Sequence, residues 1–218
     1  MRERPILFSG PMVRAIIEGR KTVTRRAIKP AWPSSVAEVL PFAGEPDAWM
    51  PCRPGAPEQP WEEQIRVCPY GKPGDRLWVR EAWAADAQVN AVAPRDLSQG
   101  EPILYPADGA IRQTGCVMIS KGATRPSIHM PRWASRILLE ITEVHVERLQ
   151  AIDPWQAIAE GVHGDVRKWF ATDAGGPAFN TPEHAFQHLW SCINGAESWA
   201  SNPWVWVVEF KHVEVANG

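Results

Sequence analysis

Apolar residues recur at helical spacing in a short segment near the N-terminus, at Met12, Val13, Ile16 and Ile17. The segment follows Ser9, a favourable N-cap, and stops before Gly19. We therefore expect a short helix between these two residues. The β-branched run at residues 22–24 then predicts the start of a strand.

Three later runs have patterns typical of strands. Residues 76–80 read as a strand with Leu77 and Val79 on one face and Trp78 and Arg80 on the other, and residues 137–142 alternate as a strand does. After the second run the apolar phase shifts, which predicts a β-bulge near residues 142–143. Residues 204–208 are apolar on both faces, a pattern typical of a central strand.

Two further helices are indicated by their first residues. Residues 153–154 (Asp-Pro) form a strong helix start, and the helix runs through Glu160 to a stop at Gly161. Residues 181–182 (Thr-Pro) open another helix, whose apolar residues gather on one side.

Two long insertions interrupt this pattern, at about 27–72 and 84–130. Ten of the 21 prolines lie between residues 30 and 73, which argues against regular helix or a central strand there. Tryptophans in the same stretch favour an ordered surface excursion over a linker. The order of elements predicts one α+β domain over residues 1–218, a small mixed β-barrel with flanking helices and two irregular insertions.

The distribution of charge adds a possible ligand to this picture. Residues 1–30 hold eight lysines and arginines against two glutamates, although the whole chain has a net charge of only −2. A basic end on a nearly neutral protein indicates either a site for an anionic ligand or a solvated basic surface.

The composition also limits the class of protein. The four cysteines are scattered, which favours reduced thiols in a cytoplasmic protein over a disulfide scaffold or a zinc site. No apolar run approaches the roughly 18 residues of a membrane span, and the apolar run at the N-terminus is too broken for a signal peptide. We expect no membrane partner. No glycine-rich phosphate loop is present, which argues against nucleoside-triphosphate chemistry. We also expect no cofactor.

The ends of the first two helices carry the residues with the clearest chemistry. Lys21 follows the stop of the first helix, and Thr24 lies three residues later. Glu160 lies at the end of the second helix, where the helix dipole disfavours a carboxylate without a partner. A desolvated Lys21 would act as base for a Thr24 nucleophile, with Glu160 orienting the lysine. The alternative is a surface salt bridge beside an ordinary strand threonine.

At this point the sequence resembles a known family. Residues 19–26 (Gly-Arg-Lys-Thr-Val-Thr-Arg-Arg) resemble the signature of ASCH domains, which belong to the PUA-like β-barrels. Other motifs agree, in the expected order, at residues 68–71, 74–81, 128–136, 159–161 and 204–210. Over most of its length the chain is similar to a longer ASCH branch from bacteriophages and prophages.

The resemblance implies a cleft suited to RNA or to modified nucleosides. One small bacterial type of this family hydrolyses N4-acetylcytidine with a Thr-Lys-Glu set, which corresponds by position to Thr24, Lys21 and Glu160. The two insertions distinguish this chain from those small members. Some relatives act as ribonucleases or only bind, so fold alone does not assign an activity.

Further residues suit binding of a nucleoside or of nucleic acid through guanidinium, aromatic and acceptor groups. They are Arg20, Arg25, Arg26, Trp78, Arg80, Glu81, His129, Arg132, Trp133 and Arg136. For the tryptophans and their charged neighbours, packing in the core and structural ion pairs are the alternative. His184 and His188 have metal-ligand spacing on one helix, but without a third ligand we expect no metal.

Three functions remain open from the sequence. The first is binding of a modified pyrimidine nucleoside, free or in nucleic acid, with hydrolysis of an N4-acyl amide. The second is a non-catalytic reader of RNA or DNA, whose binding would depend steeply on salt. The third is an accessory or assembly protein of a phage particle, with the tryptophan-rich insertions as a protein-contact surface.

Overall fold

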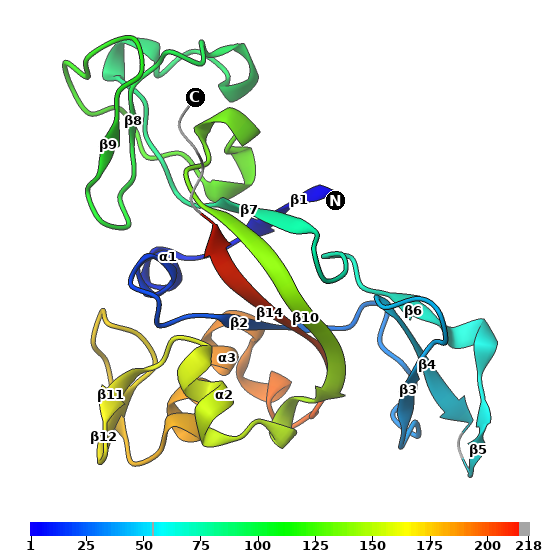
Figure 1. Cartoon of the computed structure of the whole chain (residues 1–218). Coiled ribbons are helices and arrows are strands. Elements are labelled where there is room, and N and C mark those ends of the chain that lie inside the picture. Colours follow the sequence, from blue (N-terminus) through cyan, green and yellow to red (C-terminus); the bar gives the residue numbers. More distant parts are fainter. Residues whose placement is uncertain (54, 214–218) are drawn as a thin grey trace.

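The computed structural model describes residues 1–53 and 55–213, and its fold is mixed α+β with strands predominating (Figure 1). The main sheet has five strands in the order β1-β7-β10-β14-β2. Their bounds are β1 Glu3–Leu7, β7 Arg76–Arg80, β10 Leu138–Arg148, β14 Trp204–Val213 and β2 Val23–Ala27. β1 and β7 run parallel, and the other neighbours are antiparallel. The α+β class expected from the sequence is confirmed.

The main sheet is open, so the expected closed barrel does not form. Closure requires every strand to pair on both sides, but β1 and β2 remain the two edges within the described residues. One side chain reaches from one edge to the other. Arg26 of β2 donates from Nη2 to the carbonyl of Leu7 in β1 at 2.7 Å, and its guanidinium lies 5.3 Å from the Phe8 ring centre.

The longest strand pairs hold the sheet together. β14 lies between β10 and β2, as a strand that is apolar on both faces should, and Val205, Val207 and Val208 are fully buried. The pairing of β10 with β14 shifts register between Ile141 and Glu143. The predicted bulge is therefore confirmed.

Three helices accompany the sheet: α1 Gly10–Ile17, α2 Pro154–Ala159 and α3 Pro182–Asn194. Buried residues of all three helices belong to the same apolar core as the main sheet. The predicted caps of α2 and α3 are confirmed. Asp153 and Gln156 form a capping box at α2, and the Thr181 side chain accepts from the His184 amide at α3. Ser9 precedes α1, but its side chain makes no cap hydrogen bond.

The first insertion contains more regular structure than the prolines suggested. It forms a four-stranded sheet from β3 Val39–Pro41, β4 Ala48–Arg53, β5 Ala56–Pro60 and β6 Arg66–Val67. β4 pairs with all three others, so the expectation that no central strand occurs here is wrong. Pro51 lies within β4, where it has no N–H to donate, and its carbonyl accepts a hydrogen bond from the Trp61 amide at 2.8 Å.

The second insertion is mainly irregular, as expected. Its regular strands are the short pair β8 Ile103–Leu104 and β9 Ile111–Arg112. The insertion has its own small apolar core, centred on Trp83, Tyr105 and Met130. A three-stranded sheet that the sequence did not predict lies beside α3, formed by β11 His163–Asp165, β12 Lys168–Phe170 and β13 Ala178–Phe179.

Across the described residues, no helix combines the length and the apolar character needed to cross a membrane.

Candidate functional site

A cavity of about 510 Å³ opens beside the two edges of the main sheet. The segment after β1, the β2 edge strand, the end of α2 and one side of α3 line it. Its apolar wall includes Phe8, Met12, Phe186, Leu189 and Trp190. Its polar and charged lining consists of Ser9, Lys21, Thr24, Arg25, Arg26, Lys29, Tyr70, Ser127, Glu160 and Asn194.

Local backbone geometry delivers Lys21 and Glu160 to this cavity. Gly19 adopts φ +73° and lets the chain reverse after α1, so that the amides of Arg20 and Lys21 both donate to the Ala15 carbonyl. Lys21 then forms an isolated antiparallel bridge with Glu160. Next to the bridge, a Cβ on Gly161 would lie 3.1 Å from Lys21 Cβ. The two helix ends therefore approach closely because a glycine ends α2.

The Lys21 ammonium is buried and fully hydrogen bonded. Its Nζ donates to the Val23 carbonyl at 2.7 Å, to the Glu160 carbonyl at 2.8 Å and to Glu160 Oε2 at 2.7 Å. Exposed fractions of the two side chains are 2% for Lys21 and 5% for Glu160. Burial lowers the pKa of Lys21 from its ordinary value, and attraction to Glu160 opposes this only in part. The surface salt bridge considered above is therefore replaced by a buried pair.

Thr24 lies in the same cavity but is not joined to the lysine. Its side chain is 3% exposed. No hydrogen bond connects Thr24 Oγ1 with Lys21 Nζ, both of which are among the described atoms. The structure thus gathers the three predicted catalytic residues around one cavity and pairs only two of them.

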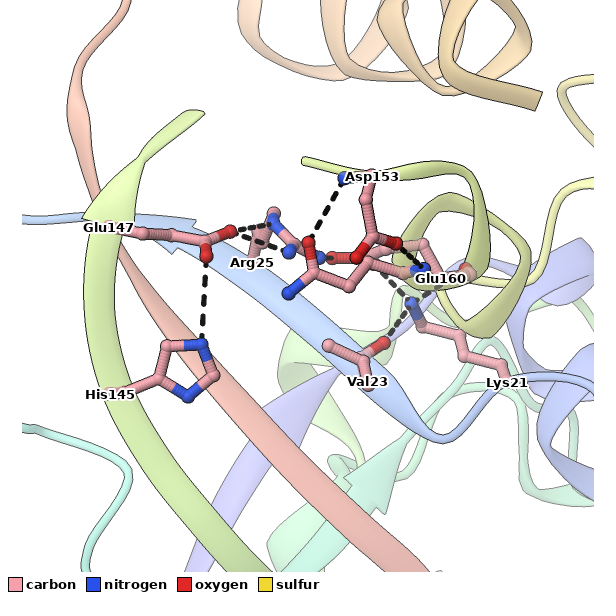
Figure 2. Close-up of polar contacts among 8 residues, drawn as sticks. Lys21, Val23, Arg25, His145, Glu147, Asp153 and Glu160 are labelled. Carbon is pink, nitrogen blue, oxygen red and sulfur yellow. Dashed lines mark hydrogen bonds and ion pairs between the residues drawn. The ribbon is translucent and has the colours of Figure 1, made fainter. Parts of the chain in front are cut away.

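Arg25 extends the buried pair into a chain of charges (Figure 2). Its Nη1 lies 3.4 Å from Glu160 Oε1, and its Nε and Nη2 donate to Glu147 Oε1 at 2.9 and 2.6 Å. Glu147 Oε2 lies 3.6 Å from His145 Nε2. The hydrogen bond and charge of Glu147 raise the pKa of His145 although burial opposes this. Burial acts to raise the pKa of Glu147, but His145 and Arg25 together lower it below its ordinary value.

Glu147 and His145 were missed at the sequence level, and the pairing register explains their position. Arg25 and His145 pair with the same residue of β14, Val207, from opposite sides. Glu147 pairs with Val205, two residues along and therefore on the same face. Arg25 thus reaches Glu147 across β14, where only valines stand between them. From the sequence, the alternation along residues 143–148 predicts that His145 and Glu147 share a face. It does not predict that Arg25 lies opposite them.

Of the predicted binding residues, only Arg25 and Arg26 line the cavity. Arg20 pairs with Glu18 at 2.6 Å and lies 3.7 Å from Asp173. His129 lines a smaller pocket with Asn90 and Arg125.

The other predicted residues form contacts around the second insertion. Arg80 lies over the Trp78 ring at 4.6 Å, and Arg132 pairs with Glu3 at 2.8 Å. Arg112 lies over the Trp133 ring at 5.2 Å. Arg136 binds Glu81 and Asp108 with two hydrogen bonds each. Arg132 and Arg136 therefore have carboxylate partners within the fold, as the structural alternative to ligand binding requires. The Arg80 guanidinium lies over the Trp78 ring instead, and its buried Nε has no hydrogen-bond partner among the described residues.

The two histidines with metal-ligand spacing have other contacts. His184 Nδ1 lies 3.2 Å from Thr181 Oγ1, and His188 Nε2 lies 3.6 Å from Cys192 Sγ. Among the residues that the structure describes, no three His, Cys, Asp or Glu side chains are grouped to hold a metal ion.

Several cavity residues were missed in the sequence analysis. Lys29, Tyr70 and Ser127 come from the insertions or their borders, and Asn194 ends α3. Tyr70 belongs to the 68–71 motif that carried part of the resemblance, which was a usable signal. Comparison of the chain with protein-family models, with curated proteins and with solved structures finds no match.

Proposed function

We propose that the protein is a PUA-like member of the ASCH family that binds a modified pyrimidine nucleoside and hydrolyses an N4-acyl amide. One observation carries the proposal. Lys21, Thr24 and Glu160 come from segments separated by 139 residues in the chain, yet they line one cavity of about 510 Å³ with aromatic rings in its wall. Ligand pockets of a few hundred Å³ with apolar walls and a few convergent polar groups are typical of small-molecule sites.

The chemistry assigned to this cavity begins with the buried pair. The Lys21 ammonium loses a proton to solvent, which leaves a neutral amine that Glu160 Oε2 orients from 2.7 Å. Burial favours that neutral form, because desolvation lowers the pKa of Lys21. The amine then accepts the hydroxyl proton of Thr24 as its oxygen attacks the acyl carbon. This requires the lysine side chain to turn from the Val23 carbonyl toward Thr24.

The remaining steps balance with water as the only co-reactant. The new C–O bond to Thr24 forms as the amide becomes tetrahedral, and the bond from the acyl carbon to N4 then breaks. The proton held by Lys21 passes to the departing N4 amine, which yields cytidine. Water hydrolyses the threonine ester, releases the carboxylic acid and restores the hydroxyl.

The direct test is release of cytidine from N4-acetylcytidine, followed by chromatography. We expect turnover by the wild-type protein and a loss of at least about a hundredfold in Thr24→Val, because the nucleophile is removed. Thr22→Val is the matched control, since Thr22 lies two residues away with an exposed side chain. Equal turnover by Thr24→Val and wild type would refute the assignment of the nucleophile.

A non-catalytic reader of RNA or DNA is the second candidate, and one observation favours it. All three ammonium hydrogens of Lys21 are already accepted by Val23 and Glu160, and none is directed to Thr24. A buried pair of this kind can support the wall of the cavity as readily as it can take part in catalysis. A reader would show no turnover, and its affinity for an RNA or DNA oligonucleotide would fall steeply with salt. Weak salt dependence without turnover would contradict both functions.

A further inference from the structure

The charges around the cavity do not balance, and the excess lies at one end. Lys21 and Arg25 are buried and are matched by two carboxylates, Glu160 and Glu147. Arg26 and Lys29 also line the cavity. Among the described residues, neither of them has a carboxylate within ion-pair distance. The cavity therefore carries two positive charges without a protein counter-ion.

These two cations lie toward solvent, whereas the proposed reacting groups are buried. Thr24 and Arg25 are 3% and 4% exposed, but Arg26 is half-buried and Lys29 is exposed. Thr24 and Arg26 are two residues apart on an edge strand, so their side chains leave the same face about 6.6 Å apart. The cavity thus has a neutralised inner end and a cationic outer end.

Free hydrogen-bonding groups stand beside the outer cations. Arg26 uses Nη2 for the Leu7 carbonyl, and no partner is found for its Nη1 within the described part of the chain. Tyr70 also lines the cavity, and burial raises the pKa of its hydroxyl, so it stays a donor near neutral pH. A guanidinium, an ammonium and a hydroxyl around one opening match the acceptor oxygens of a phosphate group.

We propose that this cavity takes a nucleotide and not a bare nucleoside, with its phosphate bound at the outer end by Arg26 and Lys29. The inference rests on the proposed function, because it places the base toward Thr24 and Lys21. The phosphate belongs either to a mononucleotide or to the backbone of a strand, and both present the same anionic oxygens.

The first test measures binding apart from catalysis, by calorimetry with the whole protein at low salt. Cytidine, cytidine 5′-monophosphate and inorganic phosphate are the probes. We expect the monophosphate to bind at least about tenfold more tightly than cytidine. In Lys29→Gln this advantage shrinks by about tenfold, whereas in Lys168→Gln, an exposed lysine outside the cavity, it persists. Arg26→Gln should reduce the affinity advantage of the monophosphate in the same way.

Equal affinities for cytidine and its monophosphate, or binding of neither, would overturn the inference. So would an advantage that survives Lys29→Gln undiminished. A short RNA with one N4-acetylcytidine separates the two sources of phosphate, since tighter binding of this RNA than of the mononucleotide identifies a strand.

Turnover of N4-acetylcytidine and of its 5′-monophosphate separates this inference from the proposed function. Equal kcat/KM for the two substrates would leave the hydrolase in place and overturn the phosphate site. Absence of turnover, with the monophosphate still preferred in binding and the preference lost in Lys29→Gln, would leave the phosphate site in place and remove the hydrolase.

Discussion

Two clusters in this protein are built on the same plan, an arginine between two carboxylates beside an aromatic ring. Arg25 joins Glu160 to Glu147 and lies 6.0 Å from the Phe186 ring centre. Arg136 joins Glu81 to Asp108 and lies 4.0 Å from the Tyr105 ring centre. The first lines the 510 Å³ cavity, and the second ties the second insertion to the end of β7.

The two clusters differ in whether their charged groups can still contact a ligand. Arg136 holds each carboxylate through two hydrogen bonds of 2.8–3.0 Å, so the cluster is closed on itself. Burial lowers the pKa of Arg136, but its bonds to Glu81 and Asp108 raise it overall. The Arg25 cluster includes a lysine with a lowered pKa and opens onto a threonine in a cavity. A buried ion pair therefore indicates a reactive site only where it faces space for a ligand.

The largest expected effect comes from removing the lysine of the Arg25 cluster. In Lys21→Met we expect N4-acetylcytidine turnover to fall by about a thousandfold, because no amine remains to accept the Thr24 proton. The wild-type rate should rise with pH to a plateau whose midpoint lies below 10.5, the ordinary lysine value, since burial favours the neutral amine. The check is turnover measured across pH. A Lys21→Met protein with an unchanged rate profile would contradict the proposed role of the lysine.

The second prediction breaks the closed cluster. Arg136→Met should lower the free energy of unfolding by about 3 kcal/mol, because Glu81, with 1% of its side chain exposed, is left without its partner. Ligand affinity of the folded fraction should not change. Urea unfolding is the measurement. Arg95→Met is the matched control, because Arg95 is 88% exposed in a loose pair with Asp96 and should cost less than about 0.5 kcal/mol.

A smaller effect is expected from changing Glu147, the second carboxylate of the Arg25 cluster. Glu147→Gln weakens the ion pair that fixes Arg25, so the Arg25 guanidinium moves relative to Glu160. We therefore expect kcat to fall by about tenfold with little change in KM. Glu143→Gln on the same strand is the control, since the Glu143 side chain is 61% exposed. Steady-state kinetics of both variants decide the point. If the two behave alike, Glu147 has no positioning role.

The smallest effect concerns His145. Its pKa is raised by Glu147, so the folded state holds the proton more tightly than the unfolded chain. The resulting stability is fully present below the ordinary pKa of 6.5 and is lost as pH rises through the folded value. We expect His145→Asn to cost less than about 1 kcal/mol at about pH 5.5 and nothing at about pH 8.5. Thermal unfolding at both pH values tests this, and a loss that is independent of pH would contradict it.

The candidate site shows where prediction from the sequence stops. Lys21, Thr24 and Glu160 were predictable because they stand at helix ends and in a short motif, where local signals are strongest. Arg132 and Arg136 carry the same residue type, yet the fold gives each a carboxylate partner outside the cavity. Residue type indicates the chemistry that is possible, whereas the available partners determine which charges remain free.

The sequence by itself determined the elements that depend on neighbours in the chain: the caps of α2 and α3, the bulge in β10 and the central place of β14. These follow from backbone preferences and side-chain periodicity within a few residues. The tertiary structure alone decided that the sheet stays open and that Arg25 faces Glu147 across β14. Such contacts depend on the register and packing of distant segments, and no local pattern specifies either.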